Sequence, residues 1–250
     1  MPPGDRQPSA MKLSVIMPVY NERSTVLEVL DRVRAVPVEK EVIIVDNLST
    51  DGTRELLEQL ELPQVRVVFQ AANMRKGNSV KRGIAAAAGE FLVIQDADLE
   101  YDPQDHVALL AAAEADDVVA AFGSRPLGAE ARGTRLPSTV FGIGRSWITS
   151  YFRLLYGSRL TDIATCYKLM RAEVARSLDL QRDGFDLDFE IACKLTRLAR
   201  LTGKRLAEVP IFYAPRTVAQ GKKIRWQDGL PALSAITQCR TWRPARLGGR

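Results

Sequence analysis

Short apolar runs, separated by segments of helical character, constrain most strongly what this chain can fold into. The runs are residues 13–20 (LSVIMPVY), 41–46 (EVIIVD), 65–70 (VRVVFQ), 90–95 (EFLVIQ) and 117–124 (DVVAAFGS). Most are apolar at successive rather than alternate positions, as expected of strands that are buried on both faces. Because such strands alternate with helices, the sequence predicts an α/β fold with a mostly parallel central sheet and helices on both faces.

Helical periodicity marks three further segments. One helix is predicted within residues 22–36, and its inward face would consist of Val26, Leu27, Leu30 and Val33. The others are predicted over residues 141–157 and 185–201, and the inward face of the latter would consist of Ile191, Leu195 and Leu198. Residues 123–140 are rich in Gly, Pro and Arg, so we expect a mobile loop there.

Polar side chains follow three of the predicted strands at the point where each strand ends. The segments are PVYNE (18–22), DNLSTDGT (46–53) and DADLE (96–100). Because ligands of parallel α/β sheets bind beyond the carboxyl ends of the strands, we expect these segments to meet at one crevice. Asp96 and Asp98 could then share one hard divalent cation, which would offset their repulsion. An isolated D-x-D is more often a solvated acidic turn, so the prediction depends on the convergence.

Composition limits the classes of protein and partner. The 250 residues carry a net charge of +5 and have a pI of about 9.2, which favours anionic partners such as nucleotide phosphates or an acidic membrane surface. The chain has no nucleic-acid-binding motif, so we predict no nucleic acid partner. No apolar run approaches the ~20 residues of a membrane span, and the first residues lack an apolar signal core, which indicates a cytoplasmic protein.

Cysteine and histidine usage argues against two kinds of site. Cys166, Cys193 and Cys239 are far apart and form no C-x-x-C pair, so we expect neither a disulfide framework nor a zinc site. His106 is the only histidine, and no nucleophile motif lies near it in the sequence. We therefore predict that His106 is a surface residue at the start of a helix.

Segments of both halves resemble a known family. SVIMPVYNE, VIIVDNLSTDGT, KGNSVKRG and QDADLEYDP, in this order and spacing, resemble the family 2 glycosyltransferases with the GT-A fold. GSRP, LTDIATCYKLMR, DFEIACKL and VPIFYAPRTVAQGKKIRWQDG are similar to segments of the dolichyl- and polyprenyl-phosphate sugar synthases within that family, mannose synthases among them. The resemblance covers roughly residues 12 to 230.

The resemblance implies a single GT-A catalytic domain over residues 12–238. Within it, residues 12–124 would bind the nucleotide sugar, and residues 125–238 would bind the acceptor. A flexible tail over residues 1–11 and a basic tail over residues 239–250 would lie outside this domain.

The resemblance also implies residues for binding the nucleotide. Pro18, Tyr20 and Glu22 would line the pocket for the base and the ribose. Asp46 would accept a hydrogen bond from the ring N–H of the base, a donor that guanine and uracil share. Asp51 would close the same pocket, with core packing or capping of the following helix as the alternative.

The remaining donor residues would lie around the D-x-D segment. Lys76 would lie near the nucleotide, and Asp96 and Asp98 would bind Mg²⁺ or Mn²⁺, which bridges the diphosphate of the nucleotide sugar. Gln95, which precedes them, is interpreted as structural. Asn47 stands where the family often has a second aspartate, which weakens the expected contact with the base.

A phosphate acceptor would need positive charge rather than a catalytic base. A phosphate monoester with a second pKa of about 6 is already largely anionic at pH 7, and arginine binds phosphate through two parallel hydrogen bonds. The predicted acceptor-phosphate residues are Arg125, Arg132, Arg135, Arg216, Lys222 and Lys223. The predicted catalytic residues are Asp98, Arg125, Arg216 and Lys223.

Acidic residues of the second half leave another acceptor open. Asp186, Asp188 and Glu190 could include a general base for a hydroxyl acceptor, or they could be acids that favour the N-terminal end of a helix. Cys166 stands where many family members have glycine, and we interpret it as a packing residue rather than a nucleophile.

The predicted function is a metal-dependent inverting glycosyltransferase that moves a hexose from GDP-mannose or UDP-glucose to a polyprenyl or dolichyl phosphate. Inversion is implied by the resemblance alone. One alternative is a family 2 transferase that acts on a hydroxyl acceptor in polysaccharide or glycolipid synthesis. The second alternative is a noncatalytic nucleotide-sugar-binding module.

A polyprenyl acceptor would require peripheral contact with the inner face of the membrane. The C-terminal segment suits such contact, because Leu230, Leu233 and Ile236 lie near one helical face and are followed by Trp242 and several arginines. The same apolar residues could instead pack on the core.

Overall fold

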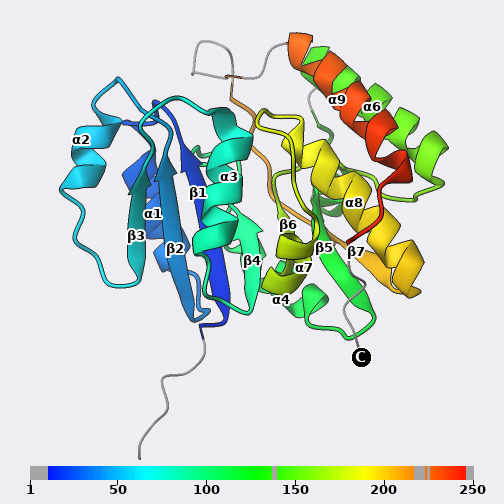
Figure 1. Ribbon diagram of the computed structural model, residues 1–250, viewed down its shortest axis with the longest axis horizontal. Helices are drawn as coiled ribbons and strands as arrows, with labels where there is room; N and C mark the ends of the chain where they lie inside the picture. The colour runs from blue at the N-terminus through cyan, green and yellow to red at the C-terminus, as the bar shows by residue number, and fades with distance from the viewer. Residues whose placement is uncertain (1–10, 137–139, 217–222, 224–225, 246–250) are drawn as a thin grey trace, which may run out of the picture.

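A seven-stranded sheet forms the centre of the molecule in the computed structural model (Figure 1). The structure describes residues 11–136, 140–216, 223 and 226–245. The strands are β1 (Leu13–Val19), β2 (Lys40–Asp46), β3 (Val65–Phe69), β4 (Phe91–Ile94), β5 (Val118–Ser124), β6 (Lys168–Arg171) and β7 (Arg205–Pro210). Their order is β3-β2-β1-β4-β6-β5-β7, and neighbours are parallel except that β6 runs antiparallel to β4 and β5. The prediction of a mostly parallel sheet is confirmed.

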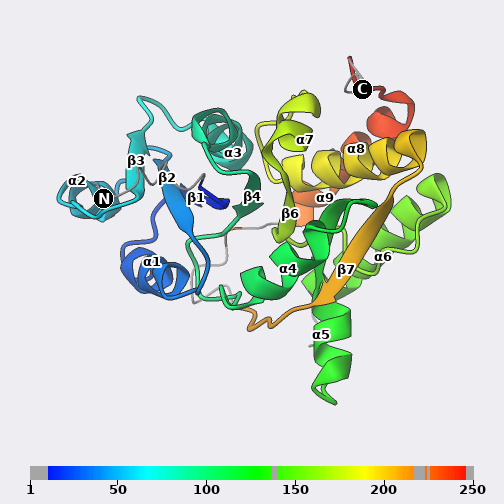
Figure 2. The same ribbon diagram turned by 90° about the horizontal axis from the view of Figure 1, so that it is seen from below.

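Helices cover both faces of this sheet, as predicted. They are α1 (Val26–Arg34), α2 (Thr53–Glu58), α3 (Arg75–Ala86), α4 (Asp105–Ala113), α5 (Arg125–Ala131), α6 (Val140–Tyr156), α7 (Ala172–Ser177), α8 (Leu187–Thr202) and α9 (Gly229–Gln238). Figure 2 shows α1 and α4 on one face of the sheet and α3, α7 and α8 on the other. α6 and α9 lie side by side near the half that contains β5 and β7 (Figure 1). Among the described helices, none has both the length and the hydropathy to cross a bilayer.

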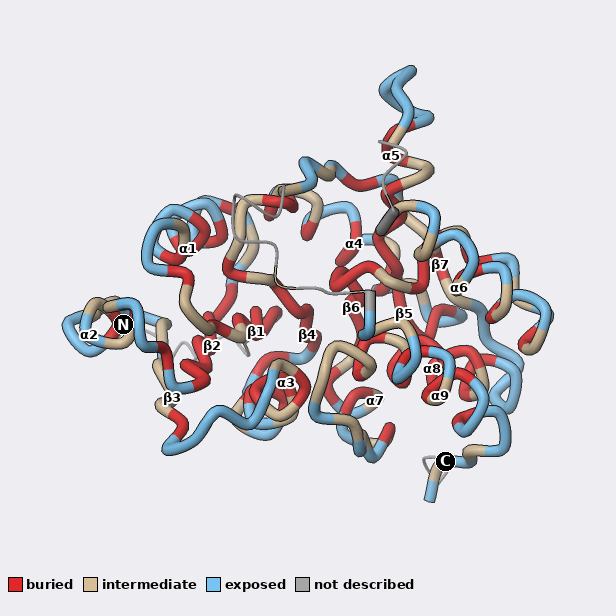
Figure 3. The backbone as a smooth tube through the Cα atoms, turned by 90° about the horizontal axis from the view of Figure 1, so that it is seen from above, coloured by how far each residue is buried: buried red, intermediate tan, exposed pale blue. Residues whose placement is uncertain are grey.

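The inner strands are buried because their two faces both meet helices (Figure 3). β2, β4 and β5 contain only buried residues, whereas the edge strand β3 is partly exposed and carries the exposed Arg66. This difference explains the sequence pattern, since only strands buried on both faces need to be apolar at successive positions.

The structure corrects the inward face that was predicted for helix α1. Its buried residues are Val26, Val29, Leu30 and Val33, whereas Leu27 is 39% exposed. A spacing of three and four residues keeps one stripe against the sheet, and Leu27 lies beside that stripe rather than on it. The inward face predicted for α8 is confirmed by the burial of Ile191, Leu195 and Leu198.

Residues 125–131 form helix α5, so the prediction of a mobile loop is wrong for this part of the chain. The hydroxyl of Ser124 caps the helix by accepting a hydrogen bond from the backbone N–H of Leu127 at 3.1 Å. Pro126 lies in the first turn, where its fixed φ favours a helix. The Gly- and Pro-rich composition therefore concealed a regular helix start.

His106 is fully buried, so the prediction of a surface residue is also wrong. It lies on the inward face of α4, and its ring packs against the ring of Tyr167 with 5.0 Å between the centroids. Burial lowers the pKa of His106 to about 3, so the imidazole is neutral at pH 7. Within the described part of the chain, neither ring nitrogen has a hydrogen-bond partner.

The buried imidazole predicts a loss of stability in mild acid. Below the ordinary histidine pKa of 6.5 the unfolded chain takes up a proton, which folded His106 does not take up until about pH 3. Between pH 7 and pH 5 the wild type should therefore lose about 2 kcal/mol more unfolding free energy than His106→Phe. Urea denaturation at both pH values measures this, and equal losses in the two proteins would contradict it.

Candidate active site

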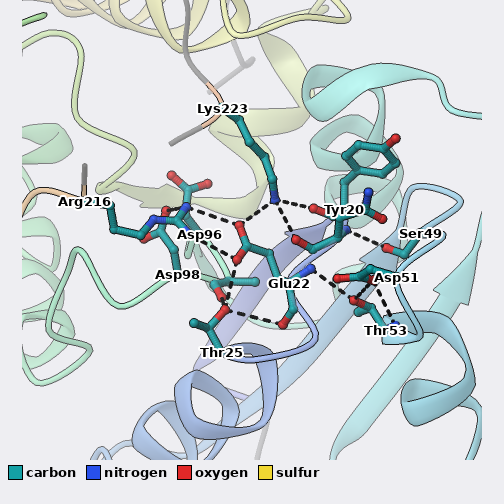
Figure 4. A network of polar contacts seen from close by, with 12 residues as sticks. Tyr20, Glu22, Thr25, Ser49, Asp51, Thr53, Asp96, Asp98, Arg216 and Lys223 are labelled. Atoms are coloured by element: carbon teal, nitrogen blue, oxygen red, sulfur yellow. Dashed lines mark hydrogen bonds and ion pairs between the residues drawn. The ribbon is translucent and has the colours of Figure 1, made fainter. Parts of the chain in front are cut away.

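The ends of β1, β2 and β4 meet at one edge of the sheet, as the sequence predicts. Asp46 is the last residue of β2 and lies beside Val19, the last residue of β1. β4 pairs with β1 up to Ile94, and Asp96 and Asp98 follow at once. Figure 4 shows the side chains of this region turned toward one another. Four of its carboxylates form what we call the acidic centre: Glu22, Asp96, Asp98 and Glu100.

Hydrogen bonds hold the turn that carries the two aspartates. The buried side chain of Gln95 accepts a hydrogen bond from the Tyr167 hydroxyl at 2.6 Å and donates one to the carbonyl of Asp96 at 2.9 Å. The hydroxyl of Thr25 donates to the carbonyl of Ala97 at 2.8 Å. The structural role predicted for Gln95 is confirmed, and the turn is fixed from both sides.

Lys76, in the first turn of α3, supplies one positive charge to the acidic centre. Its ammonium lies 2.8 Å from Asp96 and 3.3 Å from Asp188. Burial alone would lower the pKa of Lys76, but these carboxylates together raise it well above its ordinary value. The other oxygen of Asp188 lies 3.4 Å from the fully buried ammonium of Lys168, on β6. Asp188 therefore bridges two lysines and orients Lys76 toward Asp96.

The segment after β7 supplies two further cations (Figure 4). The Arg216 guanidinium lies 2.7 Å from Asp98 and 3.1 Å from Glu22. The Lys223 ammonium lies 2.6 Å from Glu22 and also donates to the backbone carbonyl of Tyr20. The chain itself thus offsets the negative charge that it gathers at this edge, and it does so with residues from distant segments.

Asp98 is buried beside other carboxylates as well as beside Arg216. Burial, followed by the charges of Asp96 and Glu100, raises the pKa of Asp98 to about 7 although Arg216 opposes the shift. No cluster of three or more His, Cys, Asp or Glu side chains among the described residues has the arrangement of a metal site. Mg²⁺, however, is commonly held by one or two carboxylates together with substrate phosphates. Asp96 and Asp98 fit that donor set once a diphosphate is present.

The carboxylates predicted to contact the nucleotide bind groups of the chain itself. Asp46 is fully buried, accepts a hydrogen bond from the backbone N–H of Ser49 at 3.2 Å and pairs with Arg54 at 3.3 Å. Asp51 accepts one at 3.0 Å from the backbone N–H of Thr53, the first residue of α2, whose N-cap position is Gly52. Contact of either carboxylate with a nucleotide stays a prediction.

Asn47 connects the end of β2 to the start of α3. Its side-chain oxygen accepts from the backbone N–H of Met74 at 2.8 Å, and its amide donates to the side-chain oxygen of Asn73 at 2.9 Å. An aspartate could not donate the second bond, which gives the departure from the family pattern a structural reason. Pro18 lies within β1 and Tyr20 directly follows it, so both lie at the predicted pocket edge.

Arg125 is buried and already paired. Its Nε and Nη2 lie 2.6 Å and 2.8 Å from the two carboxylate oxygens of Asp162, and its guanidinium stacks on the ring of Tyr213 at 5.0 Å. Although burial would lower it, Asp162 raises the pKa of Arg125 well above its ordinary value. Binding of an acceptor phosphate by Arg125 stays a prediction, and such a phosphate would have to approach this existing pair.

The other predicted acceptor residues are more scattered. Arg132 donates to the backbone carbonyl of Ile211 at 3.3 Å and stacks on the ring of Phe212 at 5.2 Å. Arg135 is exposed beyond α5, and Lys222 lies outside the described residues. Neither arginine pairs with a carboxylate of the acidic centre.

Glu190 and Asp186 contact the segment that precedes α8. Glu190 accepts hydrogen bonds from the backbone N–H groups of Gln181 and Arg182 and pairs with Lys194 at 2.7 Å. Asp186 pairs with Arg182 at 3.3 Å. Of the three acids considered as a base, only Asp188 contacts a lysine that also contacts the acidic centre.

The sequence analysis did not identify two buried residues that form ion pairs, Asp162 and Lys168 in the segment TDIATCYKLM. A lysine amid the apolar residues of a strand is a signal for a buried ion pair, but the sequence does not name its partner. Cys166, between them, is buried, and burial raises the pKa of its thiol well above the ordinary value. The interpretation of Cys166 as a packing residue is confirmed.

The sequence relationships agree with this geometry. Residues 14–178, well over half of the chain, match the domain described as glycosyl transferase family 2. The chain belongs to glycosyl transferase family 2. This glycosyltransferase is 30% identical over 221 residues to the undecaprenyl-phosphate mannosyltransferase of Micrococcus luteus, covering 85% of this chain and 87% of that protein. It is 29% identical over 247 residues to the polyprenol monophosphomannose synthase of Mycolicibacterium smegmatis, covering 88% of each chain.

Solved structures confirm the GT-A fold of this glycosyltransferase. The glucosyl-3-phosphoglycerate synthase of Mycobacterium tuberculosis in complex with UDP superposes with a TM-score of 0.68 at 16% identity, covering 94% of this chain and 82% of that one. A complex of the same enzyme with Mn²⁺, UDP-glucose and phosphoglyceric acid gives a TM-score of 0.66, with 94% and 81% covered.

The buried Arg125–Asp162 pair predicts a large effect of removing one partner. Asp162→Asn should lower the unfolding free energy of this glycosyltransferase by about 3 kcal/mol or more, because Arg125 would stay buried without its counter-ion. A matched control is Asp117→Asn, whose carboxylate lies at the same 2.6 Å from Arg205 but in an exposed pair. That change should leave the denaturation midpoint almost unchanged. Similar midpoints for both variants would contradict the prediction.

Proposed function

We propose that this glycosyltransferase is a metal-dependent, inverting enzyme that moves a hexose from a nucleoside-diphosphate sugar to a polyprenyl phosphate. GDP-mannose is the first candidate donor and UDP-glucose the second. The observation that carries the proposal is the acidic centre at the ends of β1 and β4, flanked by Lys76, Arg216 and Lys223. The names of the Micrococcus and Mycolicibacterium relatives support the acceptor class and favour mannose.

In the proposed donor complex, Asp96 and Asp98 hold Mg²⁺ or Mn²⁺. The metal would supply Lewis-acid neutralisation of the charge that grows on the leaving diphosphate. The raised pKa of Asp98 supports this assignment, because burial and the charges of Asp96 and Glu100 raise it, and a cation would relieve both. Complexes of the solved M. tuberculosis synthase with Mn²⁺ and UDP-glucose support the same donor chemistry. Asp46 would orient the base, and Lys76 would stay paired with Asp96.

The proposed acceptor needs no catalytic base. An oxygen of the phosphate monoester attacks the anomeric carbon, the bond from that carbon to the diphosphate breaks, and the nucleoside diphosphate takes the electron pair. Asp188 is poorly suited to remove a proton from a hydroxyl acceptor, because it is bridged by Lys76 and Lys168. Burial would raise the pKa of Asp188, but the two lysines lower it below its ordinary value. A phosphate acceptor is therefore favoured over a hydroxyl acceptor.

Product analysis tests the proposed reaction. The purified protein with Mg²⁺ or Mn²⁺ should convert GDP-mannose and a short polyprenyl phosphate to a mannosyl lipid, detected by mass spectrometry. Transfer from UDP-glucose instead would change only the identity of the proposed donor. Transfer to a soluble hydroxyl acceptor, with none to the lipid phosphate, would overturn the acceptor assignment. Binding of nucleotide sugar with no product on any acceptor would favour a noncatalytic module.

Asp98→Asn is expected to lower turnover by roughly 10²-fold or more, the scale of losing one preorganised electrostatic stabiliser. Calorimetry should show that Mn²⁺ no longer increases the affinity of this variant for the nucleoside diphosphate. Asp102→Asn is the matched control, because Asp102 lies on the same segment but accepts its hydrogen bond from the backbone N–H of Gln104. Metal-dependent affinity that survives in Asp98→Asn would remove this residue from the metal site.

We further propose that the protein works at the cytoplasmic face of a membrane through α6 and α9. Trp147 is 75% exposed and Leu154 81% exposed on α6, and Leu230 is exposed on α9, which packs beside α6. The predicted anchor in the C-terminal segment needs revision, because Ile236 is fully buried and Trp242 packs against the core. Exposed apolar side chains on two adjacent helices suit shallow insertion between lipid headgroups.

Replacing Trp147 and Leu154 together by serine should lower binding to anionic liposomes about tenfold or more, since two large apolar side chains would no longer leave water. Co-sedimentation measures this. Leu201→Ser is the control, because Leu201 is an exposed leucine on α8. Equal binding by the wild type and the double variant would place the contact elsewhere or exclude it.

A further inference from the structure

A pocket of about 260 Å³ lies just beyond the C-terminal end of α6. It is formed by the segment that follows α6, the last turns of α8 and the strand β7. Figure 2 shows these elements on the side of the molecule that lies opposite α2 and β3. Its lining includes none of the residues assigned above to the donor or to the acceptor. The proposed transfer reaction therefore leaves this pocket without a role.

Among the described residues, four cations and one carboxylate line this pocket, which we call the basic pocket. The cations are the exposed side chains of Arg159, Arg200, Lys204 and Arg205. The carboxylate belongs to Glu208, whose Oε1 is engaged by the chain itself. It accepts hydrogen bonds from the backbone N–H and the hydroxyl of Thr161 at 2.7 Å and 2.8 Å. Positive charge therefore predominates at the basic pocket, which favours an anionic ligand.

Two of the four cations are unpaired. Within the part of the chain that the structure describes, the side chains of Arg159 and Lys204 form no hydrogen bond and no ion pair. Arg205 pairs with the exposed Asp117 at 2.6 Å, and Arg200 donates to the backbone carbonyl of Tyr156. The dipole of α8 accounts for a cation in its last turn, which is Arg200, but not for Arg159 on another segment. The unused donors of Arg159 and Lys204 suit a phosphate, which arginine binds through two parallel hydrogen bonds and lysine as a point charge.

The basic pocket lies beside the surface that is proposed above to contact the membrane. Leu154, which is 81% exposed, precedes the pocket residue Ser158 by four residues, and Trp147 lies two turns earlier on the same side of α6. An amphipathic helix in the membrane interface inserts its apolar side chains below the level of the lipid headgroups. Charged groups at the end of such a helix therefore lie where the lipid phosphates are.

The size of the basic pocket limits the ligand. Its volume of about 260 Å³ lies below the roughly 300–1,000 Å³ that is typical of pockets for drug-sized ligands. A nucleotide sugar would not fit within it, whereas a single phosphate group with a small substituent would.

We propose that the basic pocket binds the headgroup phosphate of an anionic membrane lipid through Arg159 and Lys204. This inference rests on the proposed membrane contact through α6 and α9, and it adds a charged site to that apolar surface. A soluble phosphate compound would offer the same anionic group. Only a lipid, however, also occupies the bilayer into which Trp147 and Leu154 would insert, so that one membrane satisfies both the apolar and the charged side chains.

Replacement of both unpaired cations tests this assignment. Binding of the double variant Arg159→Gln/Lys204→Gln to vesicles of phosphatidylglycerol and phosphatidylcholine should be weaker about tenfold or more, the scale of removing two basic residues from an anionic surface. Co-sedimentation measures this. The matched control is Arg32→Gln/Arg34→Gln, which removes the same charge from exposed arginines of α1. The control should bind like the wild type, and an equal loss in both double variants would overturn the assignment.

Soluble probes separate a lipid from a free phosphate compound. Calorimetry should show that the wild type binds monomeric dihexanoyl-phosphatidylglycerol more tightly than inorganic phosphate, and that Arg159→Gln/Lys204→Gln loses this binding. Inorganic phosphate that binds as tightly as the short-chain lipid would assign the basic pocket to a free phosphate compound and overturn the lipid. Unchanged binding of the short-chain lipid by the double variant would show that the two charges act diffusely and not as a site.

Two controls separate binding from folding. The thermal midpoint of Arg159→Gln/Lys204→Gln should equal that of the wild type, because both side chains are exposed and unpaired. The variant Arg159→Lys/Lys204→Arg keeps both charges and should bind the vesicles much as the wild type does. Binding by this variant that is as weak as that of the glutamine variant would overturn the assignment.

The outcomes also separate this inference from the proposed function. If the serine variant of Trp147 and Leu154 loses vesicle binding and Arg159→Gln/Lys204→Gln keeps it, only the basic pocket fails. If the wild type binds no vesicles, the proposed membrane contact fails, and the basic pocket fails with it. In detergent, Arg159→Gln/Lys204→Gln should transfer sugar to a short polyprenyl phosphate at the rate of the wild type. A raised KM for that acceptor would assign the two cations to the acceptor and overturn a separate lipid site.

Discussion

Neutralisation of the carboxylates after β4 is the constraint on which the rest of the site depends. Asp96 and Asp98 would repel each other in a low-dielectric crevice, and the chain opposes this with Lys76 and Arg216. These cations lie 20 and 118 residues away in the sequence from their partners. The pairings therefore join the first β-strands, α3 and the segment after β7 into one unit. A nucleotide with its metal would therefore bind at an acidic centre whose carboxylates are already paired with cations of the chain.

Most of the fold could be predicted from the sequence because its signals are local. Uninterrupted apolar runs such as β2 identify inner strands, and their alternation with helices identifies the parallel sheet. The errors arose where a local signal had two interpretations. The Gly- and Pro-rich composition of residues 123–140 led to the prediction of a loop where α5 begins. The polar ring of His106 led to the prediction of a surface residue, although His106 is buried. A tertiary contact with Tyr167 accounts for the burial of His106, and the sequence does not show that contact. The start of α5 depends instead on Ser124 and Pro126, two local signals that the composition of the segment outweighed.

The gathering of polar residues at the strand ends could be predicted from the sequence, but the pairings between those residues could not. Strand ends located Asp46, Asp96 and Asp98 correctly, because parallel strands bring their carboxyl ends together. The partner of each buried charge could not be predicted. Arg125 faces Asp162, 37 residues away, and Lys168 faces Asp188, 20 residues away. Residue spacing identifies partners only within a helix or a turn, whereas these pairs join separate elements.

The antiparallel strand β6 has a consequence for biosynthesis. It lies between β4 and β5, so the open edge of β4 stays uncovered until a partner such as Met170 has been made, ~80 residues after Leu92. At ~5–20 residues per second this interval lasts roughly 4–16 seconds. During this interval β4, a fully apolar strand, is paired with β1 on one side, and its other edge has no partner strand. Nascent chains of this glycosyltransferase should therefore be exposed to edge-to-edge aggregation and depend on chaperones until β6 closes the sheet.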